Sequence, residues 1–270
     1  DVKNFLSSSG VARSAMDDSD SAHGQALQFL ESTGIPVPDT AFSDEGYKYL
    51  STYVLSLLFF SMGGEGWDDD FFFASTPNVC DWTKQKLYTG IFAEIRQEGV
   101  ICSAGEIIAI ELPLNKLSGP LPSELGLMTR LQVLGMAQNL INGNIPEEIG
   151  NMSELVIISF ENNFLEGNIP ASLGNLNKLS TFAVSQNTMD GPIPDSFSGL
   201  TALVGLGLDD NNFDGVVTPL GSLPNIRLVY LEDNAFEQTV DDSFLVDAFN
   251  TLVHLDISDN KFKGSLPAHF

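Results

Sequence analysis

The sequence repeats itself with a period of 24 residues. The frame L-x-x-L-x-L-x-x-N-x-L-x-G fits "LQVLGMAQNLING", "LVIISFENNFLEG", "LSTFAVSQNTMDG" and "LVGLGLDDNNFDG", and more loosely "IIAIELPLNKLSG", "IRLVYLEDNAFEQ" and "LVHLDISDNKFKG". Its asparagine recurs with spacings of 24, 24, 24, 24, 23 and 26 residues, at Asn115, Asn139, Asn163, Asn187, Asn211, Asn234 and Asn260. A period of this length indicates a solenoid, in which each copy buries its apolar face against its neighbours.

Each copy has the pattern of one turn of a coil. Its L-x-L core alternates apolar and polar residues, which is typical of a short strand with one buried side. The asparagine that follows predicts a structural ladder, because an inward amide can satisfy backbone groups that the bending chain would leave unpaired. Glycine and proline in strings such as "GNIPEEIG" then reverse the chain, and a short helical piece returns it to the next strand.

The strings "LSGPLPSELG", "INGNIPEEIG", "LEGNIPASLG" and "MDGPIPDSFSG" share an L-x-G-x-I-P signature. On these residues the chain resembles the leucine-rich repeat family, in its plant type, over residues 105–270. The resemblance implies an α/β fold: a right-handed solenoid, or horseshoe, of about seven repeats of 24 residues with a helical N-terminal cap. The signature weakens in "FDGVVTPLGS" and "FEQTVDDSFLVDAFN", where we expect an irregular convex side.

Residues 43–104 have the pattern of the cap. Ser43 followed by acidic residues, a long apolar run and a Gly-Gly pair predict a helix over 44–62. Together with "GGEGW" and "CDW", this segment is similar to the caps of plant-type leucine-rich repeat ectodomains, including algal and protist members. The resemblance implies a disulfide between Cys80 and Cys102. By number alone, two cysteines are equally compatible with free thiols in a reducing compartment.

An insert at 83–98, "TKQKLYTGIFAEIRQE", interrupts the family pattern inside the cap. It contains Lys84, Lys86 and Arg96, three of only twelve basic side chains in the chain. One interpretation is a surface loop with solvated lysines. The other is a docking loop for an acidic partner or for another copy of this chain.

The segment 1–42 differs in composition from the rest of the chain. "SSSGVARSAMDDSDS" is rich in Ser and Asp and predicts an extended tail, with a short helix in "SAHGQALQFLEST". The longest apolar run, "YLSTYVLSLLFFSM", is shorter than the roughly 20 residues that cross a bilayer. We therefore expect no transmembrane segment in this chain.

The charge balance narrows the class of partner. The chain has 36 acidic and 12 basic side chains, a net charge of −24, which argues against a nucleic acid or an anionic membrane surface. It contains no H-E-x-x-H, G-x-S-x-G or phosphate-binding loop motif, and its three histidines are far apart in sequence. We expect a protein without catalytic activity and without a resident cofactor.

In this fold the exposed strand positions form a concave face. The first four rows there carry small, partly apolar residues, and the last three carry acidic residues beside the ladder. We predict that ligand contacts come from Ile157, Glu161, Ser185, Asp209, Asp210, Tyr230, Glu232, Asp233, His254 and Asp256. Since stacked strands lie about 4.8 Å apart, Asp209, Glu232 and Asp256 form a weak Ca²⁺ candidate. The same acids suit a basic peptide, or form a solvated acidic surface.

These observations favour a non-enzymatic module that recognises a protein or peptide. The expected compartment is the secretory pathway: extracellular, at the cell surface, or another oxidising lumen reached by a cleaved targeting sequence. The sequon at Asn151 predicts a glycan on the convex side. The alternatives are a structural subunit of a larger stable assembly and an inhibitor of secreted hydrolases, a role that some plant-type family members perform.

Overall fold

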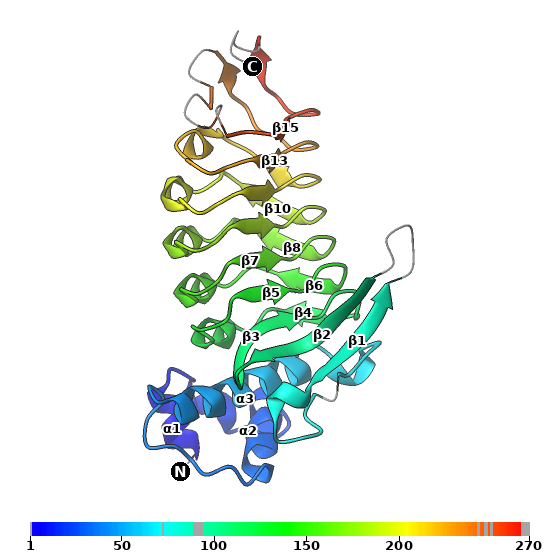
Figure 1. Cartoon of the computed structure of the whole chain (residues 1–270), viewed down its shortest axis with the longest axis vertical. Helices are drawn as coiled ribbons and strands as arrows, with labels where there is room; N and C mark the ends of the chain where they lie inside the picture. Colours follow the sequence, from blue (N-terminus) through cyan, green and yellow to red (C-terminus); the bar gives the residue numbers. More distant parts are fainter. Residues whose placement is uncertain are drawn as a thin grey trace.

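The protein is described by a computed structural model covering residues 2–71, 73–88, 94–241, 244–245, 248 and 251–265, with backbone only at 87, 88, 94 and 95. A helical N-terminal end is followed by a coil of stacked turns (Figure 1). One face of the coil is a nine-stranded sheet in the order β1-β2-β3-β5-β7-β9-β11-β13-β15.

The strands of the nine-stranded sheet follow the predicted L-x-L segments. From β3 onward they are parallel and displaced by one repeat at a time, so that Ile110 pairs with Leu134 and Leu134 with Ile158. These central residues are fully buried. The strands are β3 (Glu106–Glu111), β5 (Val133–Gly135), β7 (Ile157–Ser159), β9 (Thr181–Ala183), β11 (Gly205–Gly207), β13 (Leu228–Tyr230) and β15 (His254–Asp256). The predicted solenoid is therefore confirmed.

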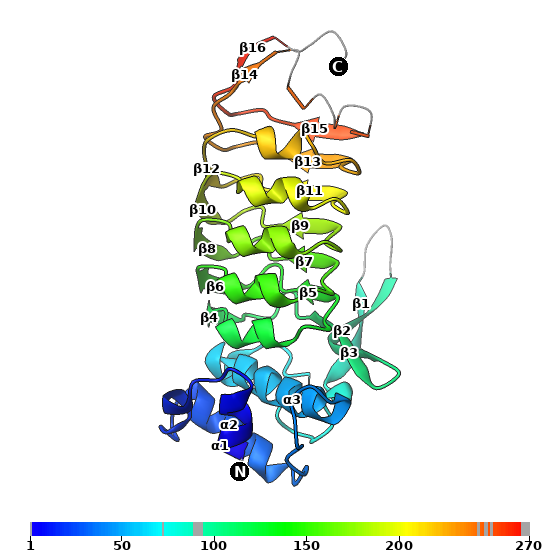
Figure 2. The ribbon, with the colours of Figure 1, turned by 90° about the vertical axis from the view of Figure 1, so that its left-hand side faces the viewer.

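The coil has two further sides, as Figure 2 shows. A second parallel sheet contains β4 (Ser118–Pro120), β6 (Leu140–Gly143), β8 (Phe164–Gly167), β10 (Thr188–Gly191) and β12 (Asn212–Phe213), and a smaller one contains β14 (Thr239–Val240) and β16 (Lys263–Gly264). Short 3₁₀ helices form the third side: η4 (Ser123–Leu127), η5 (Glu147–Asn151), η6 (Ala171–Asn175), η7 (Asp195–Gly199) and η8 (Thr218–Leu220).

Proline starts each of the first four return helices at the N-cap position. The fifth, η8, begins instead after Val217 and is shorter. This change coincides with the loss of the Ile-Pro signature in "FDGVVTPLGS", where we expected irregularity. Much of "DDSFLVDAFN" in the next repeat lies outside the described residues.

The asparagine ladder is present. The Asn139 side-chain oxygen accepts hydrogen bonds from the backbone N–H groups of Asn115 and Leu117, at 2.9 and 3.0 Å. Its amide nitrogen donates to the carbonyls of Leu112 and Met136, at 2.8 and 2.9 Å. The first rung, Asn115, contacts the cap instead of a preceding repeat, because it bonds both backbone N–H and C=O of Asp69. The ladder thereby joins the cap to the solenoid.

The predicted cap helix is α3 (Asp44–Ser61), and the Ser43 hydroxyl caps it by accepting from Gly46 N–H at 2.9 Å. It lies at the N-terminal end of the coil (Figure 1). Beyond it, Trp67, Phe73 and Trp82 form a chain of ring contacts, with centroids 5.3 and 4.9 Å apart. None of the helices among the described residues is long and apolar enough to cross a membrane.

The prediction of an extended tail over 1–42 is wrong for much of that segment. It contains α1 (Val2–Ser8) and η1 (Arg13–Met16), whereas the predicted short helix is present as α2 (Ala22–Ser32) and packs against α3. Leu6 and Leu30 are fully buried there. The Ser- and Asp-rich composition is misleading because a few correctly spaced apolar residues are enough to seat short helices on a preformed cap.

The prediction of a surface loop at 83–98 is also wrong. Strand β1 (Thr83–Tyr88) pairs antiparallel with β2 (Glu94–Ser103), and β2 pairs antiparallel with β3. The hairpin therefore extends the nine-stranded sheet and projects to one side of the coil (Figures 1 and 2). Lys and Gln have weak strand preference, so the alternation in this segment gave little signal. Residues 89–93 of the insert lie outside the described residues.

Candidate functional site

The concave face consists of the outward residues of the parallel strands. Each occupies the same place in successive repeats, so the register brings them into columns. One column contains Ala109, Val133, Ile157, Thr181, Gly205, Leu228 and His254, and the next contains Glu111, Gly135, Ser159, Ala183, Gly207, Tyr230 and Asp256. The columns match those expected from the sequence.

The N-terminal end of this face is more closed than the sequence suggested. Ala109 is buried, and its strand is covered along one edge by the hairpin, in which Ile101 pairs with Ala109. The carboxylate of Glu111 lies over Gly135, where a Cβ atom would overlap it. Burial raises the pKa of Glu111, and the nearby charges of Glu98 and Glu161 add to that rise.

Sequence reasoning did not single out Glu111. Its environment depends on Glu98, which comes from the hairpin, and the insert gave no signal that it would form a strand beside β3. Glu161, which the sequence did predict as a site residue, accepts a hydrogen bond from the Ser159 hydroxyl. Farther along, Ser185 donates in the same way to Asp209. These serines hold the carboxylates against the sheet.

Tyr230 and His254 form an aromatic pair on the C-terminal part of the face. They come from neighbouring strands, and their ring centroids are 4.6 Å apart with an interplanar angle of 34°. Tyr230 is half-buried and His254 is exposed. The structure therefore brings together two predicted site residues that are 24 residues, or one repeat, apart in sequence.

The carboxylates beside this pair differ in their environments. Glu232 is half-buried, and its Oε2 atom is buried without a hydrogen-bond partner among the residues that the structure describes. Burial raises the pKa of Glu232, and the charges of Asp209, Asp256 and Asp210 raise it further. By contrast, hydrogen bonds from the Ser258 hydroxyl and backbone N–H hold the pKa of Asp256 below its usual range.

Asp233 belongs to the same acidic region at the edge of the face. Desolvation raises its pKa, and the neighbouring carboxylates of Asp259 and Asp210 contribute to the rise. The acidic residues thus form one electrostatically coupled group next to the aromatic pair. We name the group formed by Asp209, Glu232, Asp256, Tyr230 and His254 the acidic–aromatic patch.

The geometry gives no support to the calcium candidate. In the part of the chain that the structure describes, no group of three or more His, Cys, Asp or Glu side chains is arranged to hold a metal ion. Asp209 and Asp256 each accept hydrogen bonds from serine side chains. A Ca²⁺ site formed by Asp209, Glu232 and Asp256 stays a prediction.

The basic side chains of the insert are occupied within the molecule. Lys84 forms an ion pair with Asp69 and lies 3.6 Å from Asp70. Lys86 pairs at 2.9 Å with Glu98, which is almost completely buried. Arg96 is exposed, and its charge acts on Glu111. Lys84 thus joins the hairpin to the cap, and Lys86 joins β1 to β2 within the hairpin. A docking role for this insert stays a prediction.

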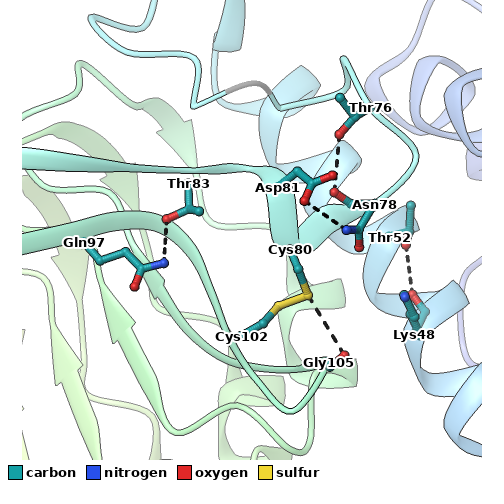
Figure 3. Close-up of a disulfide and its surroundings, with 10 residues drawn as sticks. All are labelled: Lys48, Thr52, Thr76, Asn78, Cys80, Asp81, Thr83, Gln97, Cys102 and Gly105. Atoms are coloured by element: carbon teal, nitrogen blue, oxygen red, sulfur yellow. Dashed lines mark hydrogen bonds between the residues drawn. A yellow bond between two sulfur atoms is a disulfide. The ribbon is translucent and has the colours of Figure 1, made fainter.

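The predicted disulfide is present between Cys80 and Cys102, whose Cα atoms are 5.7 Å apart. It joins η3 (Val79–Asp81) to β2, close to the turn at Gly105 (Figure 3). The disulfide therefore fixes the hairpin at its base. The predicted glycosylation site, Asn151, is exposed at the last position of η5, on the return side of the coil.

Comparisons with known proteins agree with this architecture. A family model described as Leucine Rich Repeat matches residues 251–270. Among solved structures, the plant peptide hormone receptor RGFR1 in complex with RGF2 is 31% identical, with a TM-score of 0.57, over 60% of this chain and 26% of that one. No protein with curated annotation matches the sequence.

Two further structures show the same relationship. The ectodomain of the receptor kinase GASSHO1/SCHENGEN3 from Arabidopsis thaliana, in complex with CASPARIAN STRIP INTEGRITY FACTOR 2, is 33% identical over 60% of this chain and 20% of that one, with a TM-score of 0.57. PEPR1–AtPEP1 is 24% identical over 76% and 28%, with a TM-score of 0.63, and supports the fold alone. This chain thus spans between 20% and 28% of the length of these relatives. The solenoid of this chain therefore has the leucine-rich repeat fold that is found in these plant receptor ectodomains.

Proposed function

We propose that this protein is a non-enzymatic recognition module that binds a peptide, or an extended segment of a protein, on its concave face. The support comes from the open sheet face and from its relatives. RGFR1 and the GASSHO1/SCHENGEN3 ectodomain, both more than 30% identical to this chain, were solved in complex with RGF2 and CASPARIAN STRIP INTEGRITY FACTOR 2 respectively. Gly205 and Ala183, on the middle strands, would let a bound backbone approach the sheet closely.

The observation that carries the proposal is the unpaired carboxylate oxygen of Glu232 beside Tyr230 and His254. Buried polar atoms in proteins nearly always have a hydrogen-bond partner. A lysine or arginine side chain of a ligand would supply both donors and a counter-charge, and charge-assisted bonds of this kind are among the strongest. The aromatic pair could hold the same cation over its rings or pack against an apolar neighbour. The ligand that fits is a peptide with at least one basic side chain.

We further propose that the protein works outside the cell or at its surface, with a glycan at Asn151. The disulfide supports an oxidising compartment. The N-terminal helices are seated on the chain's own cap. Packing of these helices within the chain gives no support to the alternative of a structural subunit of a larger assembly.

An array of random-sequence peptides, probed with the purified protein, tests the proposal. We expect the bound peptides to be enriched in Lys and Arg. Tyr230→Ala and Glu232→Gln should each weaken binding of the best peptide by about tenfold, as expected for central contacts of an interface. Glu166→Gln is the matched control, because it removes an exposed carboxylate from the second sheet. Bound peptides without basic residues, or equal losses in Glu232→Gln and the control, would contradict the proposal.

A further inference from the structure

A second surface, on the flank of the coil, exposes apolar side chains in the first three repeats. Leu114, Leu140 and Phe164 are 51%, 46% and 56% exposed, respectively. They lie on the turns that lead from the concave strands to the second sheet, and Leu140 and Phe164 begin β6 and β8. We name these three residues the flank patch. It is separate from the acidic–aromatic patch, which belongs to the last three repeats.

Comparison between repeats shows that the solenoid does not need apolar residues here. Leu140 and Phe164 directly follow a ladder asparagine, and the same position in the next two repeats is occupied by Thr188 and Asn212. All four residues are exposed. The fold therefore accepts polar residues at this position, and burial within the chain does not explain Leu140 and Phe164.

Leu114 is likewise an exposed apolar residue where the equivalent residues of other repeats are polar, and its backbone is strained as well. It has a left-handed conformation with φ of +53°, as have the equivalent residues Gln138, Asn162, Gln186 and Asp210. Asn and Asp adopt this conformation more readily than a bulky apolar residue does. Leu114 carries the strain without the compensation of burial. Strain that is kept in this way often marks a functional position.

The flank patch includes a hollow. A cavity of about 320 Å³ is lined by Leu114 and Leu140, with Asp68, Lys116, Gln138, Asn139 and Asn162 around them. Lys116 forms an ion pair with Asp68, so this side of the rim is electrically neutral. The Asn162 amide donates to Gln186 at 2.9 Å and begins an exposed row of amides along the coil. An apolar centre with a neutral, hydrogen-bonding rim is the usual anatomy of a protein interface.

We propose that the flank patch docks an extended segment of a different protein, which inserts one apolar side chain between Leu114 and Leu140 and packs a second on Phe164. The exposed amides of Gln138 and Asn162 would hydrogen-bond the backbone of that segment. Charge selects the partner. Glu166, Asp190 and Asp210 lie on the same flank, and the whole chain has a net charge of −24. A second copy of this chain or an acidic segment would be repelled, so the partner segment is neutral or basic.

The test uses substitutions taken from the chain's own repeats. A triple variant, Leu114→Asn, Leu140→Asn and Phe164→Thr, puts into the flank patch the residues found at Asn162, Asn212 and Thr188. It should fold as the wild type does, because each residue already occupies the same place in another turn. Val216→Thr is the matched control, because Val216 is also apolar and 43% exposed but lies outside the flank patch.

The probe is a phage-displayed library of random dodecapeptides selected on the wild-type protein. We expect a class of peptides with paired apolar residues and no excess of acids. These should bind the triple variant at least about tenfold more weakly. Their binding to Val216→Thr and to Tyr230→Ala should be unchanged, and the last comparison separates this site from the concave face. The proposal is overturned if no selected peptide depends on the flank patch. It is equally overturned if light scattering shows wild-type dimers that the triple variant abolishes, because the occupant would then be a second copy.

Discussion

At the scale of single residues, the ladder asparagines decide whether the coil can turn. Apart from Asn115, which bonds the cap, each supplies an acceptor for a backbone N–H of the preceding repeat and donors for backbone carbonyls that would otherwise be buried without partners. Asn163, for example, accepts from Ile141 N–H at 3.0 Å and donates to the carbonyls of Met136 and Phe160 at 3.0 and 3.1 Å. Because no other side chain of similar size offers both functions in this geometry, the ladder was readable from the sequence alone.

Replacing Asn163 by Ala should therefore destabilise the solenoid strongly. The substitution leaves a buried N–H without its partner, and each such orphaned group costs about 1–3 kcal/mol. We expect a loss of about 3 kcal/mol in the free energy of unfolding, measured by urea denaturation. Asn142→Ala, at an exposed position of β6, is the control and should change stability by less than about 0.5 kcal/mol. Similar losses in the two variants would show that the ladder is not essential.

Glu232 gives a residue-scale prediction about pH. Burial and neighbouring carboxylates raise its pKa, so the folded chain holds this proton more tightly than the unfolded chain does. The free energy of unfolding must then fall as pH rises from the ordinary range of a glutamate through the raised pKa. Glu232→Gln removes this titration and should flatten the fall, measured by urea denaturation across mildly acidic to neutral pH. Glu166→Gln should keep the wild-type slope, and a wild-type slope in Glu232→Gln would refute the assignment.

At the scale of elements, the two cap helices begin in the same way. In α2 and in α3 a serine caps the helix, and its hydroxyl oxygen accepts a hydrogen bond from the backbone N–H of a glycine three residues later. Both glycines sit directly against a backbone carbonyl of the preceding loop, Asp18 for Gly24 and Thr40 for Gly46. The Ser43 signal was sufficient to predict α3. A short helix was also predicted in "SAHGQALQFLEST", but nothing in the Ser- and Asp-rich context predicted its packing on α3.

The Gly46→Ala variant tests whether the close approach of Gly46 to the Thr40 carbonyl outweighs the helix preference of alanine. Alanine normally favours a helix, but here its Cβ would overlap the Thr40 carbonyl, so the loop or the helix must move. We expect a loss of about 2 kcal/mol or more in the free energy of unfolding, measured by chemical denaturation. Gly66→Ala is the control, since a Cβ there meets nothing within 4 Å. A stabilised Gly46→Ala variant would disprove the close approach.

The hairpin β1–β2 marks the limit of sequence reasoning at this scale. Its lysines were interpreted as solvated side chains. In the structure, Lys84 forms an ion pair with Asp69, and Lys86 forms one with the buried Glu98. These partners lie in segments with no periodic pattern, and the pairing depends on where the cap folds. Periodic elements were predictable because their signal is repeated and local. The hairpin was not predictable, because the residues that it contacts are brought next to it only by the tertiary fold.

At the scale of the whole molecule, the regular stacking of the repeats determines which residues lie side by side on the surface. Once the register is known, residues one repeat apart are neighbours, and the columns of the concave face follow directly from the sequence. Tyr230 and His254 could therefore be placed together in advance. The unpaired oxygen of Glu232 could not, because it depends on how deeply that side chain sinks between its neighbours. The two patches, on the face and on the flank, lie in different repeats, so the two proposed binding sites can be tested separately.

The most direct test of the central claim is hydrogen–deuterium exchange of the full chain, measured by mass spectrometry with and without the best basic peptide from the array. Peptide recognition on the concave face predicts slower exchange in β13 and β15 and in the turns that carry Asp233 and Asp259. Exchange in the cap helices and in β4 should be unchanged. Protection confined to the cap, or no protection of β13 and β15 at saturating peptide, would contradict the proposed function.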